Sequence, residues 1–120
     1  MHRKMNLQEA SEELNIDYNA ALTRFGGSEA IYQRFLKRFL QENTYNELEQ
    51  AWEKGDYEEV EKKAHTLKGV AGNLSLENLF SISNELVQTI RNKQYENTQE
   101  IYQRLQEDYK HTITVIENIN

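Results

Sequence analysis

The chain of 120 residues has no cysteine and no proline, and it has only five glycines. The absence of cysteine excludes disulfides and thiolate metal sites. The absence of proline and the scarcity of glycine disfavour a sheet with many tight turns. Glu, Gln, Lys, Leu and Asn dominate instead, a composition typical of helical proteins, and we therefore expect an all-helical fold.

Positive charge is also in deficit, with 14 Lys and Arg against 20 Asp and Glu and a formal net charge of −6. No cluster of Lys or Arg is long enough to neutralise a run of phosphates, so nucleic acid is not an expected partner. No segment resembles a signal peptide or an apolar span of about 20 residues, so no membrane association is expected and the prediction is a cytoplasmic protein. The length suits a single domain over residues 1–120.

Capping residues divide the chain into successive helical segments. Thr44 with Glu47, and Asp56 with Glu59, have the spacing of capping boxes, and Gly55 ends the segment between them. After a short first helix around residues 7–14, the expected helix starts are Asp17, Ser28, Thr44, Asp56, Ser75 and Asn97.

From residue 28 onward, apolar side chains recur at helical spacing in four long segments: 28–55, with a bend near residue 43, then 56–73, 76–93 and 97–119. Short turns join these segments. This pattern predicts an antiparallel up-and-down four-helix bundle, with two short additional N-terminal helices covering one end.

The stretch from residue 64 to residue 72 carries the most chemistry. On a helix, His65, Lys68, Gly69 and Gly72 share one face, at offsets of three, four and seven residues. At about 100° per residue, the apolar stripe of the same helix centres nearly opposite this face, so we expect His65 to be exposed. Two interior glycines disfavour a helix by about 1 kcal/mol each, and no folding benefit explains them, so the face is predicted to be a docking surface. The predicted apolar stripe is Val60, Ala64, Leu67, Val70, Ala71 and Leu74.

Plainer interpretations exist for each of these residues. A lone exposed histidine or lysine on a helix is usually only solvated. Glu61 lies four residues before His65, but such a pair without a third ligand is a poor metal site, so Glu61 is expected to be a solvated charge at the docking face. Four aromatic side chains have core spacing and are assigned to packing, and two further histidines receive no function. These residues are Phe35, Phe39, Trp52, Phe80, His2 and His111.

The string AHTLKGVAGNLS, from Ala64 to Ser75, resembles the signature of histidine-containing phosphotransfer (Hpt) domains of bacterial two-component phosphorelays. Residues 16–40 and 76–91 are similar to other parts of the same family. The resemblance implies a four-helix bundle with His65 as the phosphoacceptor. It also implies that Lys68 is the cation beside the phosphoryl group and that Gly69 is the clearance for an approaching receiver domain.

Two positions depart from the family pattern. Ser75 stands where the family usually has glycine, and we expect Ser75 to make the same turn by capping the next helix. Val87 stands where the family often has Glu or Gln, a residue that can hydrogen-bond the second ring nitrogen of the histidine. Gln88 is adjacent but is expected to point elsewhere, so neither residue is assigned the role of orienting the ring.

The chain has no GxxxxGK phosphate loop, no kinase-like nucleotide motif and no clustered carboxylates beside His65. We therefore expect a phosphocarrier and not an enzyme, with no cofactor of its own. The aspartate that exchanges the phosphoryl group with His65, and a magnesium ion, would belong to a partner receiver domain. The expected partners are response-regulator receiver domains and a hybrid sensor kinase, and the expected state is a monomer.

Two alternatives remain open. The first is a helical module that binds receiver domains as an adaptor without carrying phosphate, because the orienting residue is missing at Val87. The second is a domain cut from a larger hybrid sensor kinase. A start at Met1 and an end near the last helix favour an independent protein.

Overall fold

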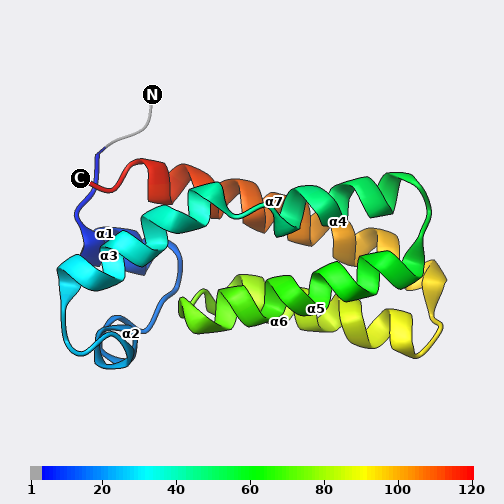
Figure 1. Cartoon of the computed structure of the whole chain (residues 1–120), viewed down its shortest axis with the longest axis horizontal. Coiled ribbons are helices and arrows are strands. Elements are labelled where there is room, and N and C mark those ends of the chain that lie inside the picture. The colour runs from blue at the N-terminus through cyan, green and yellow to red at the C-terminus, as the bar shows by residue number, and fades with distance from the viewer. Residues whose placement is uncertain (1–3) are drawn as a thin grey trace.

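The chain folds into helices joined by short turns (Figure 1). A computed structural model describes residues 4–120, so His2 lies outside the described residues. The expected all-helical class is confirmed. In the described part of the chain, no helix is both long enough and apolar enough to cross a bilayer. The elements are α1 (Leu7–Glu13), α2 (Tyr18–Arg24), α3 (Glu29–Arg38), η1 (Phe39–Gln41), α4 (Thr44–Glu53), α5 (Tyr57–Asn73), α6 (Glu77–Arg91), η2 (Tyr95–Asn97) and α7 (Thr98–Glu117).

The helices from α4 onward lie along one another, and Figure 1 shows the chain direction reversing at each connection between them. Helix α5 packs against both α4 and α6, and α6 packs against α7. Aromatic stacking joins α4 to α7: the rings of Trp52 and Tyr102 have centroids 4.3 Å apart, and those of Tyr45 and Tyr109 are 3.9 Å apart. Because stacked rings bury large apolar areas, these pairs hold the two helices together over most of the length of α4.

Helices α1 and α2 lie at the end of the molecule where α3 begins, beside both ends of the described chain (Figure 1). The backbone of Met5 pairs with the C-terminal segment, donating to the Asn118 carbonyl and accepting from the Asn120 N–H, each at 2.8 Å. The Lys37 ammonium donates to the Ile119 carbonyl at 2.8 Å. These bonds connect the C-terminal residues 118–120 both to Met5 and to α3.

Three of the expected helix starts are confirmed by side-chain caps. The side chains of Asp17, Ser28 and Asp56 each accept a hydrogen bond, at 3.1 Å, from the backbone N–H three residues later. The acceptor satisfies one of the N–H groups that have no partner inside the first turn, so each cap fixes where its helix begins.

At two other predicted starts the expected side-chain cap is absent. Thr44 is the first residue of α4 and not its cap, because its own N–H donates to the carboxylate of Glu42 at 3.0 Å. Asn97 does precede α7, but its side chain makes no capping bond. The break between α3 and α4 lies where expected, since Glu42 is extended, with ψ of 126°.

Five helices end in the same way, with one residue in the left-handed region followed by a residue whose N–H reaches back to the last turn. After α5, Ser75 has a φ of 61°, its N–H donates to the Gly72 carbonyl at 3.2 Å, and the Leu76 N–H donates to the Ala71 carbonyl at 2.9 Å. This is a Schellman motif, which favours glycine at its left-handed position. Among residues 4–120, the left-handed residues at these five ends are Asn15, Gly26, Gly55, Ser75 and Lys93, and Gly27, directly after Gly26, is left-handed as well.

The prediction that Ser75 caps the following helix is therefore wrong. The residue that precedes α6 is Leu76, and no side chain caps it. The physical reason is that Ser75 already ends α5, and its left-handed backbone is not the extended conformation that an N-cap adopts.

Replacing Ser75 with glycine should stabilise the fold. A side chain in the left-handed region costs about 1–2 kcal/mol, and the extra freedom that glycine gives the unfolded chain offsets part of this, so a net gain of about 0.5–1 kcal/mol is expected. Urea unfolding followed by circular dichroism measures it. Lys93→Gly, at an exposed left-handed position, is the matched control and should gain by a similar amount, whereas a loss of stability in both variants would contradict the assignment.

Candidate functional site

Helix α5 presents one buried side and one exposed side. Val60, Ala64, Leu67 and Ala71 are fully buried, at 0% exposure, in the contacts with α4 and α6. His65 lies on the other side of the helix and is exposed, as the apolar spacing predicts. The burial of four side chains at helical spacing fixes the rotation of α5 about its axis, so the imidazole is held outward.

Two hydrogen-bond donors, one from α2 and one from α3, contact the C-terminal end of α5. The guanidinium of Arg24, in α2, donates to the Gly72 carbonyl. The hydroxyl of Tyr32, in α3, donates to the Leu74 carbonyl at 2.8 Å. Burial raises the pKa of Tyr32, so the hydroxyl keeps its proton and remains a donor. The bond from Tyr32 satisfies a carbonyl just past the end of the helix, and the bond from Arg24 adds a second donor to the Gly72 carbonyl, which already accepts from the Ser75 N–H.

Lys68 lies one turn after His65 and is half-buried. Its ammonium nitrogen lies 5.6 Å from the centroid of the Phe80 ring, in α6. Among residues 4–120, no carboxylate lies within ion-pair distance of this nitrogen. The neighbouring lysines of α5 differ, because Lys62 pairs with Glu58 at 3.9 Å and Lys63 pairs with Glu47 at 3.4 Å.

The two glycines of the site have different surroundings. A Cβ atom placed on Gly69 would have nothing within 4 Å beyond its own helix and chain neighbours, so this position is open to solvent. A Cβ atom on Gly72 would lie 3.1 Å from Cδ2 of Phe80, closer than ordinary van der Waals contact. The expectation that neither glycine serves the fold is therefore wrong for Gly72, which lets the Phe80 ring pack against α5.

Glu61 is not the solvated charge that the sequence predicts. Its carboxylate lies 3.5 Å from Nε of Arg91, at the end of α6, and its side chain is 27% exposed. The pair links the first half of α5 to α6, so Glu61 is oriented by the neighbouring helix and is less free to move than a surface glutamate.

No neighbouring side chain orients the imidazole of His65 through a hydrogen bond, within the part of the chain that the structure describes. Val87, at the position where the family often has Glu or Gln, is fully buried in the core. Gln88 is exposed. The same residues contain no group of three or more His, Asp or Glu side chains arranged to hold a metal ion.

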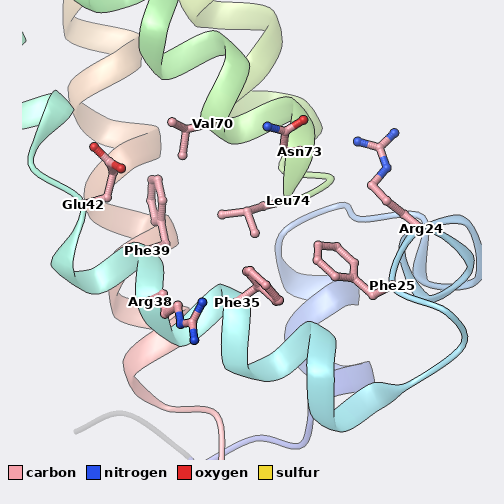
Figure 2. Close-up of a pocket in the computed structure, with 9 residues that line it drawn as sticks. All are labelled: Arg24, Phe25, Phe35, Arg38, Phe39, Glu42, Val70, Asn73 and Leu74. Atoms are coloured by element: carbon pink, nitrogen blue, oxygen red, sulfur yellow. The ribbon is translucent and has the colours of Figure 1, made fainter.

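A cleft of about 450 Å³ lies beside the C-terminal half of α5, where α2 and α3 approach it (Figure 2). Figure 2 shows Val70 and Leu74 facing Phe35 and Phe25 across this cleft. Phe35 was expected in the core, but its side chain is 37% exposed and lines the opening. None of the predicted site residues lines it. The lining residues are Arg24, Phe25, Phe35, Arg38, Phe39, Glu42, Val70, Asn73 and Leu74.

The family model described as the Hpt domain matches residues 34–114, which include all of α5 and α6. The chain belongs to the Hpt domain family. The resemblance seen in the sequence is thereby confirmed. Searches of curated proteins and of solved structures returned no match. Hpt domains are phosphocarrier modules that take part in phosphotransfer in two-component systems and interact with receiver domains.

The structure of this Hpt domain brings together most of the predicted site residues. His65, Lys68 and Gly69 lie on one accessible face, and Glu61, four residues before His65, pairs with Arg91 of α6. Phe80 was expected only in the core, since its spacing matched an apolar stripe. One signal for its second contact was available: a helical glycine four residues after Lys68 indicates the close approach of another element.

The two glycines should respond in different ways to alanine. Gly69→Ala gains the helix propensity of alanine and meets no other atom, so the free energy of unfolding should rise by about 1 kcal/mol. Gly72→Ala gains the same propensity but must displace the Phe80 ring, so its net gain should be clearly smaller or negative. Urea unfolding of both variants measures the difference. Equal stabilisation at the two positions would show that Phe80 does not need the space.

Proposed function

We propose that this Hpt domain carries a phosphoryl group on His65, taking it from the aspartate of one receiver domain and giving it to another. The observation that supports the proposal best is the exposed imidazole on a helix whose rotation is fixed by four fully buried side chains. A nucleophile on a rigid support needs little reorganisation when a partner arrives.

The transfer step follows from the chemistry of imidazole. An unprotonated ring nitrogen of His65 attacks the phosphorus of the aspartyl phosphate, a P–N bond forms, and the P–O bond to the aspartate breaks. The aspartate leaves as a carboxylate, and the reverse step passes the group onward. Imidazole suits this step because its neutral ring has one nitrogen with a free lone pair, which can act as the nucleophile.

In this proposal the neighbouring residues assist the transfer without forming bonds to phosphorus. The ammonium of Lys68 stabilises the negative charge that spreads over the phosphoryl oxygens in the transition state. Gly69 leaves room for the receiver domain, and Glu61 and the α5 backbone near Gly72 belong to the docking face. The support for these roles is the open space at Gly69 and the absence of a carboxylate beside Lys68 among residues 4–120.

We further propose that α3, η1 and α4 together form one leg of an antiparallel four-helix bundle, with α5, α6 and α7 as the other three. The domain would then comprise residues 1–120 and act with no cofactor of its own, while the partner receiver domain supplies magnesium. Its donor and acceptor would be receiver domains of a hybrid sensor kinase and of response regulators.

A second candidate is an adaptor that binds receiver domains without becoming phosphorylated. The observation that favours it is the fully buried Val87, which offers no hydrogen bond to the imidazole of His65. Binding that is unchanged in His65→Ala, together with no detectable phosphohistidine in the unsubstituted protein, would support this candidate over the first.

Substitution of His65 by glutamine should abolish labelling. Incubation with a receiver domain phosphorylated on its aspartate should give acid-labile, base-stable phosphate on the unsubstituted protein and none on His65→Gln. The matched control is His111→Gln, since His111 is also exposed but lies on α7, 3.9 Å from Glu13. The control should label fully, and persistent labelling of His65→Gln would refute the assignment.

Lys68→Ala should slow the transfer and leave the fold intact. The loss of a nearby charge is expected to remove about 1.4 kcal/mol of transition-state stabilisation, which corresponds to a roughly tenfold lower rate. Rapid-quench measurement of the phosphorylated protein gives this rate. Lys62→Ala, on the same helix but paired with Glu58, is the control and should transfer at the original rate. Equal slowing by both substitutions would point to a general charge effect.

A further inference from the structure

We propose that Phe80 is a positioning residue for Lys68: its ring holds the lysine ammonium at the phosphotransfer face without neutralising the charge. This inference rests on the proposed function. Phe80 lies in the first turn of α6, and its ring centroid is 5.6 Å from Nζ of Lys68, within the range of a cation–π contact.

Gly72 makes this contact possible. Lys68 and Gly72 are four residues apart and therefore lie on one stripe of α5. The ring of Phe80 approaches Gly72 so closely that a Cβ atom there would be 3.1 Å from Cδ2 and 3.3 Å from Cε2. The ring thus occupies the surface that a side chain at position 72 would cover, directly beside Lys68.

An aromatic ring and a carboxylate would hold the ammonium with different consequences. A carboxylate, like Glu47 beside Lys63, cancels the positive charge and occupies its N–H donors. The face of a ring attracts the cation through its quadrupole, and it leaves the full charge and outward N–H donors for phosphoryl oxygens. A lysine side chain that is already oriented also loses less rotamer freedom when the phosphoryl group arrives.

A double-mutant cycle on the transfer rate tests the proposal, with Lys68→Ala, Phe80→Leu and the two combined. Phe80→Leu should slow transfer about two- to fivefold, the effect expected from losing a cation–π contact at a half-buried site. The same substitution in the Lys68→Ala background should have no further effect. Phe80→Tyr keeps the ring face and should retain the original rate. Equal slowing by Phe80→Leu with and without Lys68 would overturn the proposal.

Gly72→Ala adds a second arm, because it acts on the ring and not on the lysine. It should slow transfer by a larger factor in the presence of Lys68 than in Lys68→Ala. Gly69→Ala is the matched control, since it obstructs only the approaching partner and should slow transfer by the same factor in both backgrounds. If Gly72→Ala behaved like Gly69→Ala, its effect would be on docking and the proposal would fail.

A measurement that needs no phosphoryl transfer separates this inference from the proposed function. In proton NMR, the side-chain methylene protons nearest the Lys68 ammonium should be shifted upfield by the ring current, relative to those of Lys62. Phe80→Leu should remove the shift. Absence of the shift in the unsubstituted protein would refute the contact even if His65 is phosphorylated. Its presence without labelling of His65 would refute the proposed function alone.

Discussion

The arrangement of the site depends on the buried stripe of α5. Because α4 covers one flank of this helix and α6 covers the other, four side chains lose all contact with water and the helix cannot rotate without exposing them. The position of His65 follows from this constraint alone. A side chain roughly opposite the stripe has no neighbouring helix to pack against, so exposure of the imidazole is a consequence of core packing and needs no separate device.

Rotation is only one of the freedoms that must be fixed, since α5 could still slide or fray at its end. The bonds from Arg24 and Tyr32 hold the last carbonyls of the helix, and the pair between Glu61 and Arg91 holds its first half against α6. These contacts come from α2, α3 and α6. Helices α2 and α3 therefore help to position α5, although both are far from His65 in the sequence.

Local capping signals in the sequence predicted the helix starts correctly where a residue has only one structural role. Asp17, Ser28 and Asp56 cap helices because each is followed three residues later by a free N–H, a relation within one turn. The prediction was wrong at Ser75. This serine could either end α5 in the left-handed conformation or cap α6 in the extended conformation, and the structure shows that it ends α5. Contacts between helices, such as Lys68 with Phe80, have no fixed spacing, so periodicity gave the face of each residue but not its neighbour across the interface.

The distribution of ion pairs explains why one lysine of α5 differs from the others. Acidic residues outnumber basic ones in this chain, and within α5 both Lys62 and Lys63 pair with a carboxylate. Lys68 is surrounded instead by a glycine with open space around it and by an aromatic ring. Both neighbours are uncharged. A cation that must meet a transient anion benefits from such surroundings, because no permanent anion has to be displaced first.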